Sequence, residues 1–361
     1  MVDALARNAP ALTSARFSVS KGLITVGSAT VILFLISGVL APSSISGTSL
    51  SGMLPIACVL AVAGLGQMLV VQQGGIDLSV PGMISLTAVI VTHNPDGNDA
   101  LLLPAIALAL VFAVVAGFAN GLMIGSLRLN PIIATLGTNA LLYGADLAIS
   151  GGRPRITTKL MQTISGGQTF GIPNAVFFAL GVLIVVSVLV KKTVAGRRFE
   201  AVGANPEAAR AIGLRVRSHQ TLAYVWAQLL YCLAGIMIAG ITAQPSAFEG
   251  DKFLLPSVAV VVLGGTSLLG GRGFPLATLI AAVFLQQLTQ FVITLGVSTA
   301  IQTLVQAAAL AVGVSLYTVN WRAVFARFSR TPSVPPPPTA APPAPSSLEN
   351  TTPAAASADA V

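Results

Sequence analysis

Charge is what this sequence has least of. Only 8% of its 361 residues are Asp, Glu, Lys or Arg, whereas an ordinary soluble domain carries about 25%. Hydrophobic residues make up 54% of the chain, and its mean hydropathy is +0.86. So few charges cannot cover a soluble surface. The composition therefore excludes a soluble enzyme, a disordered protein and a nucleic-acid-binding domain, and it favours an integral membrane protein with many spans.

Cysteine and histidine are also scarce. Cys58 and Cys232 lie within apolar runs, and His93 and His219 are far apart in sequence. We expect two small buried thiols rather than a disulfide framework, and neither pair has the spacing of a metal site. The sequence also lacks a Gly-x-x-x-x-Gly-Lys-Ser/Thr phosphate loop and any Ser/His/Asp set. We therefore expect no catalytic residue, no metal, no cofactor and no ATPase site in this chain.

Ten apolar stretches approach the length of about 20 residues that crosses the hydrocarbon of a bilayer. Two of them are short, and Gly74, Gly75 and Pro81 indicate an interrupted backbone, which is tolerated at membrane depth only beside protein or water. The expected fold class is therefore an all-α integral membrane protein with about ten transmembrane helices, some broken. The stretches are 22–40, 54–71, 80–92, 101–125, 132–150, 175–190, 221–243, 254–270, 276–295 and 299–319.

Positive charge divides the segments between these stretches into two groups. Fifteen of the nineteen Lys and Arg residues fall on the same side as both termini. Because basic segments stay in the cytoplasm, both termini are expected to be cytoplasmic. We expect a cytoplasmic segment over 1–21, a membrane domain over 22–319, and a basic, then Pro- and Ala-rich, disordered tail over 320–361. The other four basic residues, which we place outside, are Arg153, Arg155, Lys159 and Lys252.

The most charged interruption, residues 191–220, separates the first five spans from the last five. It is too short for an enzyme domain. Within it, Asn205 can cap a helix that begins at Pro206, and Gly213 can end that helix. This short helix has an Ala-rich face that suits a groove on a partner protein, and a solvated loop helix is the alternative. The residues expected to couple to such a partner are Asn205, Glu207, Ala208, Ala209 and Gly213.

A carboxylate lies between two apolar runs in the stretch Gly74-Gly75-Ile76-Asp77-Leu78-Ser79-Val80. A charge at this place is costly unless it is paired, hydrogen-bonded or hydrated, and the glycine pair allows a tight turn or a close helix approach. Two interpretations remain open. The break lines or gates a translocation path, or Asp77 only caps the helix that begins near Val80.

These stretches resemble a known family. Gly74–Val80 is similar to the Gly-Gly-Ile-Asp-Leu-Ser-Val of ribose- and xylose-type monosaccharide permeases. Asn205–Gly213 resembles the coupling loop of ABC-importer permeases, without the Ile-x-Leu-Pro that follows it in the wider family, and it fits the sugar branch better. Two more stretches, Asn120–Gly137 and Val261–Gly273, are similar to the same family in the same order. The resemblance covers roughly residues 22–319.

The resemblance implies the transmembrane permease subunit of an ATP-binding-cassette importer that moves a monosaccharide across a bacterial inner membrane. It also implies a cobalamin-importer-permease-like fold in membrane lipid. The implied partners are ABC ATPase subunits carrying ATP-Mg, a periplasmic sugar-binding protein and a second permease subunit, expected to form a homodimer. A branched-chain amino-acid ABC permease and, more distantly, a proton-coupled secondary transporter are the alternatives. The residues expected along the translocation path or gate are Gly74, Gly75, Asp77, Ser79, Asn120, Gly264 and Gly265.

Overall fold

The computed structural model describes residues 21–298, 300–305, 307–308 and 311, all of which belong to the first of two units, 1–317. The predicted tail over 320–361, nearly all of the predicted N-terminal segment and most of the tenth expected span lie outside the described residues. Within them every regular element is a helix, except for one antiparallel hairpin of β1 (Gln168–Thr169) and β2 (Ile172–Pro173).

Seven helices of the described part are long and apolar enough to cross a membrane. The expected count of ten is therefore not confirmed. The third expected span contains only the 14-residue helix α3 (Val80–His93), and the eighth only the 10-residue α11 (Leu254–Leu263). The seven long helices are α1 (Lys21–Leu40), α2 (Gly47–Gln72), α4 (Leu102–Gly125), α5 (Pro131–Ser150), α7 (Asn174–Lys192), α10 (Val216–Thr242) and α12 (Pro275–Thr294).

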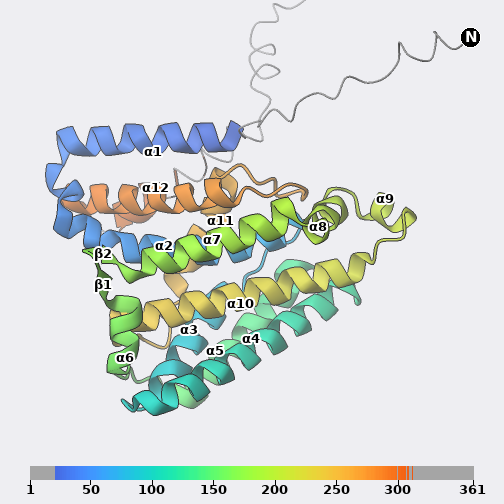
Figure 1. Ribbon diagram of the computed structural model, residues 1–361, viewed down its shortest axis with the longest axis horizontal. Helices are drawn as coiled ribbons and strands as arrows, with labels where there is room; N and C mark the ends of the chain where they lie inside the picture. The colour runs from blue at the N-terminus through green and yellow to red at the C-terminus, as the bar shows by residue number, and fades with distance from the viewer. Residues whose placement is uncertain (1–20, 299, 306, 309–310, 312–361) are drawn as a thin grey trace, which may run out of the picture. The chain divides into compact units, whose positions relative to one another are not determined.

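The long helices run side by side, and short elements gather at their two ends (Figure 1). One end, here called the α9 end, carries α8 (Val194–Ala204) and α9 (Pro206–Ala211). The opposite end, called the η4 end, carries η4 and the hairpin. The remaining short elements are η2 (Pro42–Ile45), η3 (Asp99–Leu101), α6 (Lys159–Met161), η4 (Gln162–Gly166) and η5 (Asp251–Phe253).

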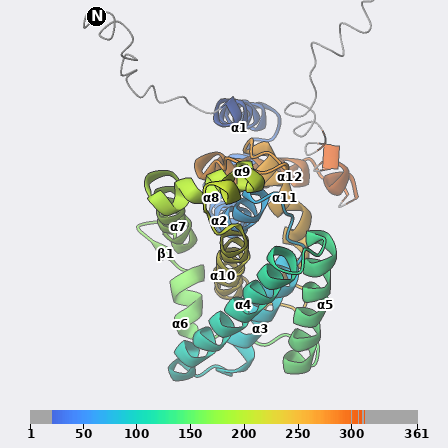
Figure 2. The same cartoon turned by 90° about the vertical axis from the view of Figure 1, so that its right-hand side faces the viewer.

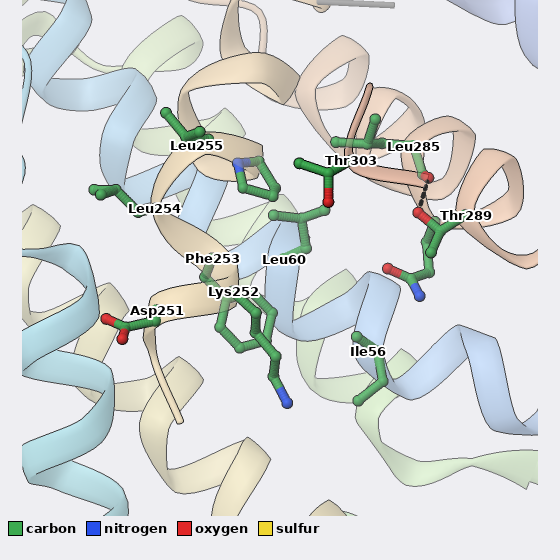
Figure 3. A pocket seen from close by; sticks show the side chains of 12 residues that line it. Ile56, Leu60, Asp251, Lys252, Phe253, Leu254, Leu255, Leu285, Thr289 and Thr303 are labelled. Carbon is green, nitrogen blue, oxygen red and sulfur yellow. Dashed lines mark hydrogen bonds between the residues drawn. The ribbon is translucent and has the colours of Figure 1, made fainter. Parts of the chain in front are cut away.

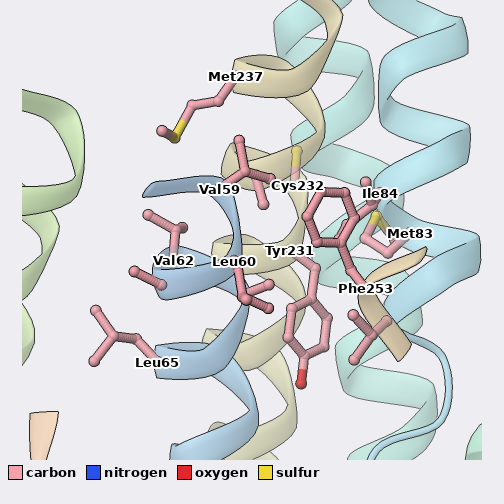
Figure 4. Close-up of a cluster of buried hydrophobic side chains, with 14 of the residues drawn as sticks. Val59, Leu60, Val62, Leu65, Met83, Ile84, Tyr231, Cys232, Met237 and Phe253 are labelled. Carbon is pink, nitrogen blue, oxygen red and sulfur yellow. The ribbon is translucent and has the colours of Figure 1, made fainter. Parts of the chain in front are cut away.

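The core lies around α2, α3 and α10. Helix α10 packs against α4, α2 and α3, while α2 also contacts α12, α11 and α7. Viewed from the α9 end, α10 lies between α2 on one side and α4 with α3 on the other (Figure 2). In α3 every residue from Val80 to Thr92 is buried. Figure 4 shows the packed side chains, with Tyr231 and Cys232 of α10 near Val59 and Leu60 of α2, and with Val62 and Leu65 on the other side of α2.

A stripe of small residues lets α4 lie close to α10. On α4, Ala105, Ala109 and Ala113 are followed at the same four-residue spacing by Gly117 and Gly121, and all are buried. A Cβ atom on Gly121 would lie 2.6 Å from the Cα atom of a threonine of α10. Small residues at this spacing allow transmembrane helices to approach closely. The stripe is visible in the sequence, although our sequence analysis did not identify it.

This contact gives the first prediction. Gly121→Leu should destabilise the protein by about 1–3 kcal/mol, because the larger side chain forces α4 away from α10. The thermal unfolding temperature of the detergent-solubilised protein measures this effect. Gly144→Leu is the control, because a Cβ atom on Gly144 of α5 meets no atom within 4 Å. Equal unfolding temperatures for the two variants would contradict the close α4–α10 contact.

Candidate functional site

The chain breaks sharply after α2. Gly74 has a left-handed backbone, with φ +76°, and the amide of Gly75 donates to the carbonyl of Val70 at 3.2 Å. These bonds form a helix-ending turn in which glycine avoids the strain of a positive φ. A Cβ atom on Gly75 would overlap the hydroxyl of Tyr224 on α10. Both predicted glycines are thus needed locally, one for the turn and the other for close packing.

The seven residues from Gln73 to Ser79 are not helical and run between α2 and α3. Asp77 and Ser79 in this segment are completely buried. One carboxylate oxygen of Asp77 accepts from the amide of Ser79 at 2.8 Å and also from its hydroxyl. The other oxygen accepts from Nε2 of Gln228 at 3.1 Å. Hydrogen bonds to a carboxylate offset part of the cost of burying it.

Further side chains extend this network. Nε2 of Gln228 also lies 2.6 Å from the Ser79 hydroxyl, and Nδ2 of Asn120 donates to the same hydroxyl at 3.2 Å. The Thr138 hydroxyl donates to Oδ1 of Asn120 at 2.5 Å. Among the described residues no Lys or Arg pairs with Asp77, since the three ion pairs found there lie elsewhere. The Asp77 network is therefore held by neutral donors from α4, α5 and α10.

The irregular backbone is satisfied by side chains of neighbouring helices. The amide group of Gln67 lies 3.2 Å from both the backbone N and O of Asp77, oriented so that it donates to O and accepts from N. The amide of Leu78 donates to the Thr135 hydroxyl at 2.9 Å. The amide of Gly82 donates to Oδ1 of Asn139 at 2.8 Å. Polar residues within apolar helices thus replace the missing helical hydrogen bonds.

The hydrogen bonds of Asp77 are not those of a residue that caps α3. An N-cap side chain bonds amides one turn inside its helix, whereas Asp77 bonds the amide of Ser79, the residue that precedes α3. The structure brings Asp77, Ser79 and Asn120 together beside the Gly74–Gly75 turn. It places Gly264 and Gly265 at the end of α11 instead, where a Cβ atom on Gly22 of α1 would lie 2.6 Å from the Gly264 carbonyl. Their assignment to a path or gate stays a prediction.

A second break precedes the eighth expected span. Residues 243–250 form an irregular segment that enters from the η4 end, and η5 and α11 follow. Gly250 donates its amide to the Ser85 hydroxyl of α3 at 2.9 Å, and a Cβ atom on Gly250 would overlap the carbonyl of Pro81. The second break therefore contacts the first turn of α3, which directly follows the first break. Interrupted segments at corresponding places in the two halves of a transporter mark its substrate path.

The capping expected around α9 is confirmed. Oδ1 of Asn205 accepts from the amides of Glu207 and Ala208 at 3.1 and 3.0 Å. Pro206 occupies the first helical position, and Gly213 ends the turn with φ +83°. That these residues couple the chain to a partner protein stays a prediction.

The faces of α9 differ from the expected arrangement. Ala209 is 3% exposed and packs with Val202 and Val216, with Leu214 beside them. Its neighbour Ala208 is exposed. Ala209 therefore belongs to a small core within residues 191–220, and the surface left for a partner is formed by other residues. These exposed residues are Glu207, Ala208, Arg210, Ala211 and Ile212.

Helix α8, within residues 191–220, contacts the break after α2. The sequence analysis did not predict this helix or its contact. Nε2 of Gln73 donates to the carbonyl of Phe199 at 2.9 Å. The carbonyl of Gln72 accepts from the amide of Gly271 at 2.9 Å, and it lies so close to Gly203 that a Cβ atom there would overlap it. The first break, α8 and the loop after α11 thus meet at the α9 end.

Two side chains beside the first break were not identified from the sequence. Gln228 and Tyr224 lie on α10, far in sequence from Asp77. Gln228 is a completely buried amide within an apolar helix, and such an amide needs partners. That polarity was the available signal, but it does not say which residue the amide meets.

Comparison with known proteins identifies relatives among membrane permeases. The family described as "Branched-chain amino acid transport system / permease component" matches residues 49–314. The ribose import permease protein RbsC of Bacillus subtilis is 34% identical over 291 residues, which are 79% of this chain and 89% of that protein. No solved structure gives a significant match.

Two other relatives have similar coverage. The probable ABC transporter permease protein y4mJ of Sinorhizobium fredii is 31% identical over 278 residues, covering 76% of this chain and 83% of that protein. The autoinducer 2 import system permease protein LsrC of Salmonella paratyphi B is 30% identical over 271 residues, covering 74% and 78%. All three proteins carry the word permease in their names.

The Asp77 network gives the second prediction. Gln228→Leu should cost about 1–3 kcal/mol of stability, because it removes a donor from a buried carboxylate. Asp77→Asn should lower the stability less in the Gln228→Leu background than in the wild type. In that background the Asp77 carboxylate has already lost its Gln228 donor, so removing its charge costs less. Thermal unfolding of the two single variants and the double variant measures this coupling. Gln244→Leu, an exposed position beyond α10, should change stability by less than about 0.5 kcal/mol. Additive losses would contradict the contact between Asp77 and Gln228.

Proposed function

This chain belongs to the permease-component family that its central residues 49–314 match, and we propose that it carries a monosaccharide through the membrane as part of an ATP-binding-cassette importer. Its relatives at 30% identity or more include ribose and autoinducer 2 import permeases. The single structural observation that supports a transport path is the contact of Gly250, in the second break, with Pro81 in the first turn of α3, which follows the first break. Irregular backbone at membrane depth is tolerated where it lines a cavity or is covered by protein.

The relatives favour a sugar over the alternatives. The family description names branched-chain amino acids, but the ribose permease shares 34% of aligned residues with this chain. The Gly74–Val80 stretch, which resembles sugar permeases, forms the first break. A proton-coupled carrier needs a relay of ionisable groups across the membrane. The completely buried carboxylates of the described residues are Asp77 and Asp146, and Asp77 is held by amide and hydroxyl donors.

We place the α9 end in the cytoplasm of a bacterium and the chain in its inner membrane. Residues 191–217 at this end contain seven Lys and Arg residues, which fits the bias of cytoplasmic loops. Both termini then face the cytoplasm. The ATPase partner, with its ATP-Mg, binds the exposed face of α9, and a periplasmic sugar-binding protein delivers solute at the η4 end. A second copy of the chain completes the path, and the fold is of the cobalamin-importer-permease type.

Motion of the ATPase reaches the first break by a short route. Displacement of α9 moves α8 through the small core of Val202, Ala209 and Val216. Helix α8 moves the α2 end because Gly203 touches the Gln72 carbonyl. The break from Gln73 to Ser79 then shifts, and the helices alternate between inward- and outward-open arrangements. Asp77, Ser79 and Asn120 act as gate residues in this motion.

The third prediction tests the transported substrate. The complete importer, with its ATPase and binding protein in proteoliposomes, should take up a radiolabelled monosaccharide from a panel that begins with D-ribose. Uptake should require ATP and persist with a protonophore. Labelled leucine is the control for the branched-chain alternative. Uptake of leucine but of no sugar, or sugar uptake abolished by the protonophore, would contradict the proposed function.

The fourth prediction tests the docking face. Ala208→Arg should abolish ATP-driven uptake and co-purification of the ATPase, because it places a long charged side chain on the exposed face of α9. Folding should be retained, since Ala208 is exposed. Ala208→Ser, which keeps a small side chain, should behave as the wild type. Ala209→Arg should instead lower the amount of folded protein. Normal uptake by a well-inserted Ala208→Arg variant would argue against docking at this face.

A further inference from the structure

Three charged residues lie below the η4 end of the bundle, and one of them, Lys252, is among the basic residues that we expected outside. Glu249, Asp251 and Lys252 follow the irregular segment of the second break. Gly250 bonds Ser85, which lies about 12 Å below the α3 end at His93, at 1.5 Å per helical residue. Asp251 accepts a hydrogen bond from the hydroxyl of Tyr143 on α5. These contacts place the charges below the η4 end of the bundle.

The depth of Tyr143 agrees with this placement. Tyr143 lies about 10 Å below the α5 end at Ser150. Helix α5 has 20 residues and is therefore about 30 Å long, which is the thickness of the hydrocarbon. The turn that carries Asp251 thus lies at hydrocarbon depth, between the surface and the middle of the membrane.

This turn is nevertheless exposed. Asp251 is exposed, the Lys252 side chain is 48% exposed, and Phe248 is 49% exposed. Lys252 pairs with Glu249, which is only 14% exposed. Exposed charges at hydrocarbon depth are too costly to face lipid, and in membrane proteins they face a water-filled cavity or the bundle interior. The surface around η5 therefore faces water rather than acyl chains.

The turn also borders a pocket of about 530 Å³ between α2, α11 and α12. Asp251 and Lys252 lie at one side of this pocket (Figure 3). Gln286 and Thr289 of α12 line it from the opposite side. The pocket has the size range of small-molecule sites, with a few polar groups among apolar ones.

The chemistry of the turn suits a polyhydroxylated ring. Oδ1 of Asp251 accepts from Tyr143, and the structure gives Oδ2 no hydrogen-bond partner among the described residues. The rings of Tyr143 and Phe248 lie 5.2 Å apart at a 49° tilt, so the partly exposed Phe248 ring is held in place. A carboxylate accepts hydroxyl hydrogens, and an aromatic face packs against the C–H surface of a sugar.

We propose that the η5 turn is a sugar-contacting subsite of the permease, formed by Phe248 and Asp251 and positioned by Tyr143. This inference rests on the proposed function and adds the place where the sugar touches this chain. Oδ2 of Asp251 binds sugar hydroxyls, and the Phe248 ring covers one face of the sugar. The pocket beside Lys252 holds the rest of the molecule as it passes.

Water access to the turn is the first test. Phe248→Cys is made in a variant with Cys58→Ser and Cys232→Ala, after that background is shown to import the sugar. A charged, membrane-impermeant methanethiosulfonate reagent should label it about tenfold faster than Leu141→Cys, because the reactive thiolate forms only beside water. Leu141 is the control, as it is 77% exposed on the same helix as Tyr143 and at similar depth. Equal, slow labelling of both positions would overturn the subsite.

Sugar contact is the second test. In the complete importer with ATP and the binding protein, D-ribose or the monosaccharide that the wild type imports best should slow the labelling of Phe248→Cys. Asp251→Asn should lower sugar uptake and change the relative rates for sugars that differ in one hydroxyl group. The subsite would be overturned if the wild type imports sugar, the sugar does not slow the labelling of Phe248→Cys, and Asp251→Asn leaves the relative uptake rates of the sugars unchanged. A wild type that imports no sugar would instead overturn the proposed function.

Discussion

The structure depends on one constraint, which is that every backbone amide and carbonyl at membrane depth needs a hydrogen-bond partner. Two segments, Gln73–Ser79 and 243–250, do not form helices. Around the first, the partners come from side chains on two helices. Gln67 of α2 serves Asp77, while Thr135 and Asn139 of α5 serve Leu78 and Gly82. Helix α3 serves the second segment, through Ser85. The polar residues of these apolar helices therefore lie where the backbone is irregular.

This arrangement also explains why the breaks suit movement. A helical backbone bond is fixed by the helix itself, and replacing it would unwind a turn. A bond to a side chain can be exchanged by rotating that side chain. Gln228 contacts both Asp77 and Ser79, and Asn120 reaches the same hydroxyl from α4. Several donors surround two acceptors, so the Asp77 network has alternative pairings that an unbroken helix lacks.

Length and hydropathy predicted most of the long helices, because a span of about 20 apolar residues has few other ways to cross a membrane. Capping chemistry predicted α9, because the Asn205 and Gly213 signals are local. Hydropathy failed in the eighth span, where residues 254–270 carry no charge but only Leu254–Leu263 form the helix. It also missed α8, which has the composition of a polar loop. The contact between Asp77 and Gln228 joins residues 151 positions apart, and no local pattern encodes such a pairing.

The two breaks are unequal with respect to the proposed ATPase. The first is tied to α8 at the α9 end through the Gln72 carbonyl and the Gln73 side chain. The second enters from the opposite end and meets the first turn of α3, where Gly250 lies against Pro81. A movement that begins at α9 therefore reaches Asp77 before it reaches Asp251. Because Pro81 has no amide hydrogen to donate, this meeting point is held by packing and by the Ser85 bond. In the proposed coupling route, the contact between Gly250 and Pro81 is consequently where motion passes from the α9 end toward the η4 end.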